Sequence, residues 1–417
     1  MLLEFTCSNH ISIRKQVLFS TLAGRDTSNM EKVENIAGLR VLKSAVIYGA
    51  NGSGKSNFIN AISFIKNLVL NSINYQPGQG MPQTPHKLEG FHKISTYQIQ
   101  FIANGIRYTF GVSLKEMIVT EEYLYYFPNG KQTKIFERKD ETFSAGSKFR
   151  GKFSVCKDVL KPNRLLLSCA ANFSSVEEVT WAFKFFSDAL IIYNPGHQDD
   201  SWLNYSLNQI HNSAKIKQAV LDFFKELNTG IKDINITIDK AQIDSSMLPP
   251  FLSDEFKKML INEKVNAIST KIVYDKFETD LIAEESTGIK KLFSMLCPIL
   301  DVLANGKVLI CDELEAGLHE ALVYELVKLF ISTHTEHPAQ LIFTTHETGL
   351  LNLDLFRRDQ IWFTEMKAED RSTDLFSLAE IRNVRRTENI QKGYIAGKYG
   401  GIPMLNIDFA KIVENYK

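Results

Sequence analysis

The chain has 417 residues, 44% of them hydrophobic, enough to bury a large core in two domains or in one domain with a substantial insertion. Its 48 basic and 48 acidic side chains balance, so the overall charge does not draw the protein to nucleic acid or to an anionic membrane. Five scattered cysteines without a C-x-x-C pair argue against a zinc site. The lack of a signal-peptide pattern or of a run of 18 apolar residues predicts a soluble, cytoplasmic protein.

The first 70 residues predict three strands and a helix. Two short strands at 2–6 and 16–19 are expected to pair at the edge of the main sheet. The apolar run at 41–48 predicts a third strand, and 57–70 carries apolar residues at helical spacing.

Between that third strand and the helix lies a complete phosphate-binding loop, Gly-Ala-Asn-Gly-Ser-Gly-Lys-Ser at 49–56. Its glycines let backbone N–H groups turn toward phosphates, and the helix N-terminus adds a favourable dipole. Lys55 is expected to reach the β- and γ-phosphates, and the Ser56 hydroxyl to bind Mg²⁺. The residues predicted to contact the nucleotide are Gly49, Ala50, Asn51, Gly52, Ser53, Gly54, Lys55, Ser56 and Asn57.

The predicted secondary structure changes twice in the middle of the sequence. A connection rich in Pro, Gly and Gln at 74–90, expected to be mobile, precedes two predicted hairpins that turn at Asn104-Gly105 and Asn129-Gly130. The pattern then becomes helical, with a capping box at 174–178 and an amphipathic helix at 214–227, but without the heptads of a coiled coil. The sequence therefore predicts an α/β protein in four segments, with a helical insertion as the second: 1–160, 161–262, 263–363 and 364–417.

Two apolar strands in the second half end in polar residues. The strand at 307–311 precedes Asp312 and Glu313, the Walker B pattern, in which Asp312 orients Mg²⁺ and Glu313 polarises an attacking water. The strand at 341–345 precedes His346. Because ligands gather at the carboxyl ends of parallel strands, we expect His346 to face the γ-phosphate, although a purely structural histidine also fits this position.

A further anion-binding candidate is Ser286-Thr287-Gly288, which opens a predicted helix upstream of the Walker B strand. Backbone N–H groups at such a turn suit a phosphate, but serine and glycine are also ordinary helix-capping residues. The order and distance of this turn relative to the Walker B strand make it a candidate signature motif.

Together these motifs resemble the ABC-type ATPase heads of the SMC, RecF and OLD group. The resemblance rests on the phosphate-binding loop, the Ser-x-Gly turn, the run Asp-Glu-Leu-Glu-Ala-Gly-Leu-His at 312–319 and Thr-Thr-His at 344–346. Within that group the chain is most similar to stand-alone AAA-family ATP-binding proteins of bacterial phage-defence and abortive-infection operons, such as RloA and the AriA subunit of PARIS. Segments 5–11, 358–363 and 392–403 also resemble these proteins.

The resemblance implies an ABC-type P-loop ATPase head with an antiparallel β section and an inserted helical region, which binds ATP with Mg²⁺ and hydrolyses ATP. It also implies a head-to-tail dimer or higher oligomer, in which Ser286 and Gly288 complete the site of the second protomer and 314–319 crosses the interface. Glu320 stands where the group usually has proline. The candidates for the glutamine that the group places near the γ-phosphate are Gln76, Gln79 and Gln83, with His86 as a replacement.

The leading functional hypothesis is an ATPase that senses phage infection and controls a separately encoded effector nuclease or toxin, of Toprim, HNH or RloB type. The basic segment 381–398 is a candidate docking surface for an acidic partner, a phage-derived trigger or nucleic acid, or else a solvated helix face. The alternatives are a RecF-like or SMC-like DNA-repair ATPase that binds DNA when ATP closes it, and a scaffold that binds ATP tightly and turns over slowly. The ATPase subunit of a membrane transporter fits less well, because the sequence predicts no membrane segment.

Overall fold

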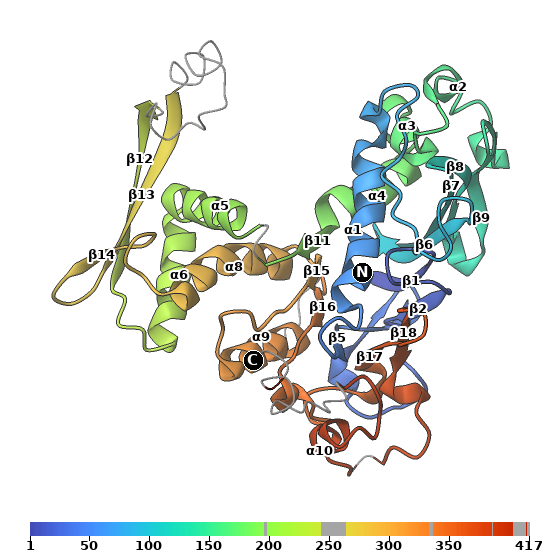
Figure 1. The fold of residues 1–417 in the computed structure, drawn as a ribbon. Helices are drawn as coiled ribbons and strands as arrows, with labels where there is room; N and C mark the ends of the chain where they lie inside the picture. The colour runs from blue at the N-terminus through green and yellow to red at the C-terminus, as the bar shows by residue number, and fades with distance from the viewer. Residues whose placement is uncertain (196–197, 243–263, 333–336, 386, 403–413, 415–417) are drawn as a thin grey trace. The chain divides into compact units, whose positions relative to one another are not determined.

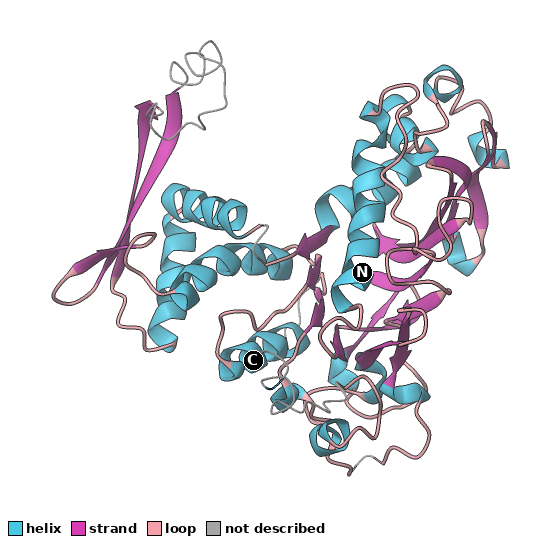
Figure 2. Cartoon of the chain, in the orientation of Figure 1, coloured by secondary structure: helices cyan, strands magenta, loops and turns pink. Residues whose placement is uncertain are grey.

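The computed structural model describes residues 1–195, 198–242, 264–332, 337–385, 387–402 and 414 (Figures 1 and 2). They form two compact units. The head unit comprises Met1–Asn194 and Val302–Lys417, and the inserted unit comprises Pro195–Asp301. The head is therefore built from both ends of the sequence. Among the described residues, no helix combines the length and the apolar character that crossing a bilayer requires.

A six-stranded sheet of the head unit carries the phosphate-binding loop. Its order is β11-β15-β16-β5-β17-β18, and neighbouring strands are parallel except for the antiparallel pair β17 and β18. The central strands are buried along their whole length, which is why they read in sequence as continuous apolar runs. The strands are β5 (Ser44–Gly49), β11 (Leu190–Tyr193), β15 (Val308–Cys311), β16 (Gln340–Thr344), β17 (Ile361–Met366) and β18 (Thr373–Ser377).

A seven-stranded antiparallel sheet, ordered β10-β9-β8-β7-β6-β1-β2, is the second large sheet of the head. Both predicted hairpins are confirmed, and Asn104 and Gly105 have the positive φ angles (48° and 71°) that a tight hairpin turn needs. The strands are β1 (Leu2–Ser8), β2 (Val17–Ser20), β6 (Ser95–Ala103), β7 (Ile106–Lys115), β8 (Ile118–Tyr126), β9 (Thr133–Lys139) and β10 (Thr142–Ala145).

The predicted pairing of the first two strands is correct, but their predicted place is wrong. β1 pairs with β2 and with β6, so both strands belong to the antiparallel sheet and not to the sheet of the phosphate-binding loop. The reason lies in the pattern of β1. Its buried and partly exposed residues alternate, as in an antiparallel sheet with one packed face, whereas the parallel sheet requires burial on both faces.

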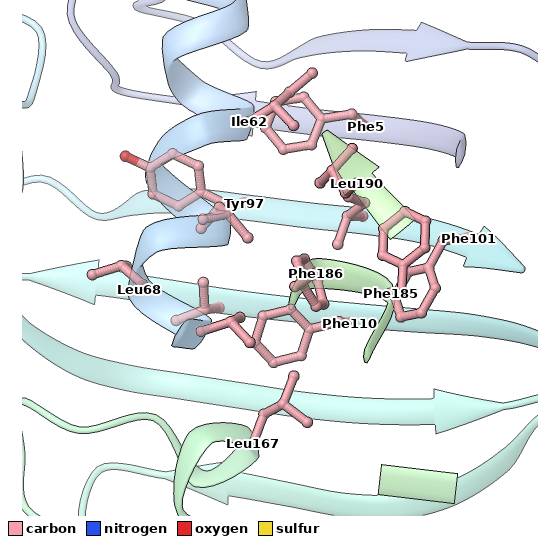
Figure 3. Packing of buried hydrophobic residues seen from close by; sticks show 14 of the residues in the cluster. Phe5, Ile62, Leu68, Tyr97, Phe101, Phe110, Leu167, Phe185, Phe186 and Leu190 are labelled. Carbon is pink, nitrogen blue, oxygen red and sulfur yellow. The ribbon is translucent and has the colours of Figure 1, made fainter. Parts of the chain in front are cut away.

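The core of the head joins helix α1 (Lys55–Asn71) to both sheets (Figure 3). Phe58 and Ile62 of α1 lie in the same buried cluster as Phe5 of β1 and Ile47 of β5. A fully buried side chain of this size stabilises the fold by about 1.5–3 kcal/mol. The helix that begins at the phosphate-binding loop is therefore held by apolar packing along its length.

Shorter elements complete the head unit. The α-helices are α2 (Cys156–Val159), α3 (Leu166–Phe173), α4 (Glu177–Lys184), α9 (Glu320–Ser332) and α10 (Ile390–Ile395), and a small sheet pairs β3 (Val33–Ile36) with β4 (Leu39–Leu42). The 3-10 helices are η1 (Met30–Lys32), η2 (Ser72–Asn74), η3 (Pro128–Gly130), η4 (Ser147–Phe149), η7 (Thr348–Leu350), η8 (Arg358–Gln360) and η9 (Leu378–Glu380), and η5 (Phe185–Ala189) is a π-helix.

The predicted capping box at 174–178 is wrong. The N-cap position of α4 is taken by Val176, whose side chain cannot accept a hydrogen bond. The Ser174 hydroxyl instead donates to the carbonyl of Ala170 at 2.7 Å, at the end of the preceding helix α3. A serine between two adjacent helices can serve either one, and here it completes the first.

A buried ion pair fastens α3 to the antiparallel sheet. The Glu122 carboxylate of β8 accepts the N–H groups of Leu166 and Leu167 at 2.6 and 2.8 Å, at the start of α3. Arg138 of β9 lies 3.5 Å from the same carboxylate, and both side chains are completely buried. Burial raises the pKa of Glu122, while Arg138 and the two N–H groups oppose that shift.

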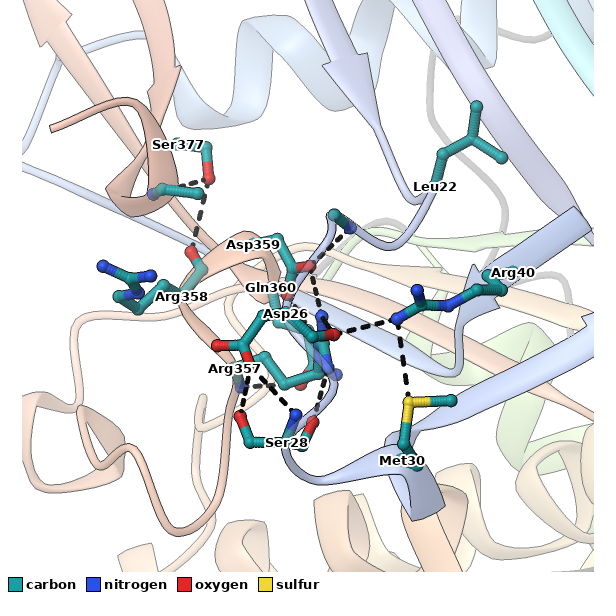
Figure 4. A network of polar contacts seen from close by, with 12 residues as sticks. Leu22, Asp26, Ser28, Met30, Arg40, Arg357, Arg358, Asp359, Gln360 and Ser377 are labelled. Atoms are coloured by element: carbon teal, nitrogen blue, oxygen red, sulfur yellow. Dashed lines mark hydrogen bonds and ion pairs between the residues drawn. The ribbon is translucent and has the colours of Figure 1, made fainter. Parts of the chain in front are cut away.

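A second polar network joins the segment before β3 to η8 (Figure 4). The Arg357 guanidinium makes two hydrogen bonds to Asp359, at 2.9 and 2.8 Å, and also donates to the carbonyls of Asp26 and Ser28. Asp359 in turn accepts the N–H of Gly24 at 2.8 Å. This network fixes the entry to β17, the strand that lies beside β5.

The inserted unit differs from the predicted helical segment 161–262. Residues 161–194 belong to the head, whereas the helix that follows Ser286 belongs mainly to the inserted unit, and 243–262 lie outside the described residues. The unit contains strands as well as helices. An antiparallel hairpin follows the helix predicted at 214–227. Its elements are α5 (Asp199–Asn212), α6 (Ala214–Glu226), β12 (Asp233–Gln242), β13 (Lys264–Val273), β14 (Glu278–Asp280) and most of α8 (Thr287–Ala304).

Candidate functional site

The phosphate-binding loop connects β5 to α1, as the sequence predicts. Gly52 and Gly54 have φ angles of 76° and 106°, a left-handed conformation that favours glycine. The first hydrogen bond of the helix runs from the N–H of Phe58 to the carbonyl of Gly54 at 3.0 Å. The N–H groups of Lys55, Ser56 and Asn57 precede this bond, so they form the free, positively polarised end of α1.

A cavity of about 330 Å³ lies at this end of the helix. Its wall joins the loop residues to two side chains from the far end of the sequence, Glu313 and His346. Both follow strands that are parallel to β5 and end at the same edge of the sheet, β15 and β16. The loop residues that line the cavity are Asn51, Gly52, Ser53, Gly54, Lys55, Ser56 and Asn57.

Lys55 is nearly buried beside the cavity, at 5% exposure. Its ammonium group donates to the carbonyls of Gly49 and Ala50, at 2.8 and 3.3 Å, so these two residues hold the lysine rather than line the cavity. Burial lowers the pKa of Lys55, and the carboxylates of Asp312, Glu313 and Glu315 act in the opposite direction. Three negative charges thus favour a protonated lysine.

Thr344, at the end of β16, organises the Walker B carboxylates. Its hydroxyl donates to the Asp312 carboxylate at 2.6 Å and accepts the N–H of Glu313 at 2.7 Å. Asp312 is buried, whereas Glu313 is exposed at the cavity. Glu313 also has a φ angle of 47°, a left-handed conformation that costs a non-glycine residue roughly 1–3 kcal/mol. The threonine therefore holds a strained residue in place.

A chain of hydroxyl groups supports the loop from behind, and no motif in the sequence predicts it. The Ser53 hydroxyl lies 2.6 Å from that of Thr364 on β17, and the Thr373 hydroxyl of β18 donates to the Ser53 carbonyl at 2.9 Å. Ser12 lies 2.7 Å from Thr373 and accepts from the amide of Asn57. The loop is thus attached to strands that begin more than 300 residues later.

The close packing behind the loop also explains its glycines. A Cβ atom on Gly49 would lie 2.2 Å from the Thr364 hydroxyl, and one on Gly54 would lie 2.1 Å from that of Thr373. Only glycine lets the backbone lie this close to these threonines. The positively polarised helix end, Lys55, the Ser56 hydroxyl and Asp312 form a donor and ligand set that fits a triphosphate with Mg²⁺.

The candidate signature residues lie in the inserted unit. The Ser286 hydroxyl accepts the N–H of Ile289 at 3.3 Å, so it caps the first turn of α8. Gly288 is the second residue of the same helix. The head unit therefore contains the loop, Glu313 and His346, whereas Ser286 and Gly288 belong to a different compact unit.

The candidates for a γ-phosphate glutamine do not line the cavity. Gln83 donates to the Ser95 hydroxyl and accepts the N–H of Met117, both at 2.9 Å, which pins the connection at 74–90 to the antiparallel sheet. Gln79 accepts the N–H of Gln76, and His86 is buried and accepts the N–H of Leu88.

The basic C-terminal segment is only partly described. Arg386 and Pro403 lie outside the described residues. Glu388 binds Lys398 and accepts the hydroxyl hydrogen of Tyr399 at 2.6 Å, so one cation of the segment is already paired. Arg382, Arg385, Arg386 and Lys392 supply the rest of its positive charge.

A family model described as "AAA domain, putative AbiEii toxin, Type IV TA system" matches residues 44–150 and 207–352, more than half of the chain. The matched residues include the phosphate-binding loop, the Walker B carboxylates and His346. The chain belongs to this AAA domain family. The second matched stretch also covers most of the inserted unit, so this AAA domain includes both compact units.

Similar solved structures are head domains of SMC proteins. An SMC head bound to the C-terminal winged-helix domain of ScpA has a TM-score of 0.43 and 16% identity, over 90% of this chain and 97% of that one. The SMC head domain from Thermotoga maritima has a TM-score of 0.40 and 14% identity, over 90% and 98% of the two chains. Among curated proteins, no sequence matched significantly.

Proposed function

We propose that this AAA protein is an ATPase whose nucleotide site works as a switch between two copies of the chain. The observation that carries the proposal is the cavity in which the loop residues, Glu313 and His346 meet. In this assignment the loop N–H groups and Lys55 hold the β- and γ-phosphates. Ser56 and Asp312 hold Mg²⁺, which neutralises phosphate charge when it is bound.

Hydrolysis requires a group that orients a water molecule against the γ-phosphate. Glu313 is the exposed carboxylate of the cavity, and Thr344 fixes its backbone, so we assign this role to Glu313. His346, on the same wall, contacts the γ-phosphate in this assignment. Asp312 is held for metal binding by its bond from Thr344.

The proposed second step is closure of a head-to-tail dimer. Ser286 and Gly288 then bring the N-terminal end of α8 to the nucleotide of the other copy, and 314–319 crosses between the copies. A contact that exists only with ATP bound shifts the population toward the closed dimer. ATP binding would close the assembly and hydrolysis would reopen it.

We further propose that the closed and open states control a separately encoded effector nuclease or toxin in an anti-phage defence system. Two features support this proposal: the resemblance to RloA and AriA, and the toxin–antitoxin wording of the matching family. A phage-derived molecule would act as the trigger, and the basic segment 381–398 is a candidate surface for it.

Purification from cells that carry the native neighbouring genes tests this function. We expect an affinity-tagged chain to recover a companion nuclease or toxin, and Lys55→Ala to lose phage protection. Lys152→Ala, which removes an exposed lysine of the head, is the matched control and should retain protection. Recovery of the tagged chain alone, together with full protection by Lys55→Ala, would overturn the proposal. Salt-sensitive, ATP-dependent binding of DNA by the isolated protein would instead favour the DNA-repair alternative.

A further inference from the structure

Two segments that flank the nucleotide cavity are joined by hydrogen bonds along their length. One follows β15 and the other follows β16. The N–H of Leu314 donates to the carbonyl of Thr344 at 3.1 Å, next to the bond between the Glu313 N–H and the Thr344 hydroxyl. The segments that carry the Walker B carboxylates and His346 are therefore joined by hydrogen bonds.

Glu315 makes the next bond in this series, and it does so through its side chain. One carboxylate oxygen accepts the backbone N–H of His346 at 2.6 Å, from a residue 31 positions away. The short distance is typical of a charge-assisted hydrogen bond. The Glu315 carbonyl accepts the N–H of Leu318 at 2.7 Å, which fixes the turn that carries the carboxylate.

The second carboxylate oxygen of Glu315 is buried and has no hydrogen-bond partner among the described residues. A buried, unpaired carboxylate oxygen is costly, so its position calls for a compensating interaction. The charge of Glu315 acts on Lys55, whose protonated form it favours. Glu315 does not line the cavity, whereas His346 does.

His346 depends on backbone contacts for its position. No described residue makes a hydrogen bond to its imidazole, so the polar contacts that position this residue are those of its backbone. Two hydrogen bonds hold the backbone at and after this residue: Glu315 accepts the His346 N–H, and the Tyr48 hydroxyl donates to the carbonyl of Glu347 at 3.0 Å. Tyr48 precedes the phosphate-binding loop directly.

We infer that Glu315 is a positioning residue, whose carboxylate holds the backbone of His346 so that the imidazole faces the γ-phosphate position. The inference rests on the proposed function for its kinetic consequence, but the hydrogen bond itself can be tested separately. Because Glu315 lies within 314–319, it also links the segment assigned to the dimer interface with the histidine at the nucleotide. Closure of the dimer would then change the position of His346 through this hydrogen bond.

Hydrogen exchange tests the bond without reference to catalysis. In the nucleotide-free protein, Glu315→Ala should raise the exchange rate of the His346 amide at least about tenfold, because the amide loses its acceptor. Glu315→Gln should leave that rate within about threefold of wild type, since an amide oxygen still accepts. Glu347→Ala is the matched control, because it removes a neighbouring carboxylate and leaves the His346 N–H bond intact. Unchanged exchange in Glu315→Ala would overturn the inference, whatever the ATPase activity of the protein.

A double-mutant cycle tests whether Glu315 affects catalysis through His346. Glu315→Ala should lower kcat about 10- to 100-fold with nucleotide affinity within about threefold of wild type, and Glu315→Gln should recover most of that loss. In a His346→Ala background, Glu315→Ala should cost less than about threefold, because the side chain that it positions is already gone. Equal costs in the two backgrounds, or lost nucleotide affinity, would overturn the positioning role. A wild-type protein without ATPase activity would refute the proposed function, and hydrogen exchange would still decide the Glu315 bond.

Discussion

The hydroxyl of Thr344 donates a 2.6 Å hydrogen bond to Asp312 and at the same time accepts the N–H of Glu313. A single threonine on β16 therefore sets the geometry of both carboxylates at the end of β15. The metal-binding candidate and the water-orienting candidate depend on one hydroxyl from the neighbouring strand.

This relationship predicts the effect of Thr344→Val, which keeps the shape of the side chain but removes the hydroxyl. The N–H of Glu313 then loses its acceptor, and Asp312 loses its donor. We expect kcat to fall about 10²-fold while nucleotide affinity changes by less than about fivefold. Steady-state phosphate release and binding of a fluorescent ATP analogue measure the two effects. Thr344→Ser, which retains the hydroxyl, serves as the control and should keep most of the activity.

Glu313→Gln should separate nucleotide binding from hydrolysis. The cavity and Asp312 remain, but the carboxylate that orients water is lost, so we expect hydrolysis to fall by about 10² to 10⁴. The closed dimer should then accumulate with ATP, as measured by light scattering after size exclusion. Hydrolysis at the wild-type rate by this variant would show that Glu313 has another role.

Glu122→Ala should destabilise the head unit without touching the nucleotide cavity. The substitution leaves Arg138 buried without its carboxylate and leaves the N–H groups of Leu166 and Leu167 without an acceptor. Loss of one member of a buried ion pair typically costs about 3–5 kcal/mol. Chemical denaturation measures this loss. Replacing the neighbouring exposed carboxylate, Glu121→Ala, should cost less than about 1 kcal/mol.

The buried imidazole of His10 should make the stability of the fold depend on pH. Burial lowers the pKa of its imidazole from 6.5 to about 4, although the hydrogen bond with Asn60 opposes the shift. The unfolded chain therefore binds a proton at a higher pH than the folded chain does. As pH falls from about 6.5 to 4, the unfolded state gains the proton first and the free energy of unfolding decreases, by up to about 3 kcal/mol from this residue.

The test of this pH dependence compares variants across the same range. His10→Gln cannot take up the proton, so its stability relative to wild type should improve steadily as pH is lowered from 6.5 to 4. His92→Gln, which removes an exposed histidine, should follow the wild-type curve. A constant difference between His10→Gln and wild type over this range would show that the imidazole does not titrate as inferred.

The sequence predicted those parts of the site that are encoded in contiguous residues. The loop 49–56 is one such stretch, since its glycines, lysine and serine occur at a fixed spacing between a strand and a helix. Glu313 and His346 could be assigned to the same site because each closely follows a buried parallel strand, and such strands end at one edge of a sheet. In the structure these residues line one cavity.

The supporting residues could not be predicted, because their contribution depends on which strands become neighbours. Thr364 and Thr373 are ordinary strand residues in sequence, and they matter because β17 pairs with β5 and β18 pairs with β17. Ser174 could not be assigned for a related reason. A serine between two adjacent helices can bond to either one, and the sequence alone does not indicate which, whereas in the structure Ser174 bonds to the first helix. The boundaries of the inserted unit also follow from packing rather than from composition.

The hydroxyl chain behind the loop has a consequence for the order of events during synthesis. β5 lies between β16 and β17, and the loop rests on Thr373 of β18, so its neighbours leave the ribosome long after the loop itself. Pairings across such a sequence separation form late, because closing the intervening chain costs entropy before any contact is gained. A nascent chain that ends before β16 has the complete loop sequence but lacks the strands that shape it. Nucleotide affinity should therefore arise only when translation of the head is almost complete, and a nascent chain could not enter the nucleotide cycle early.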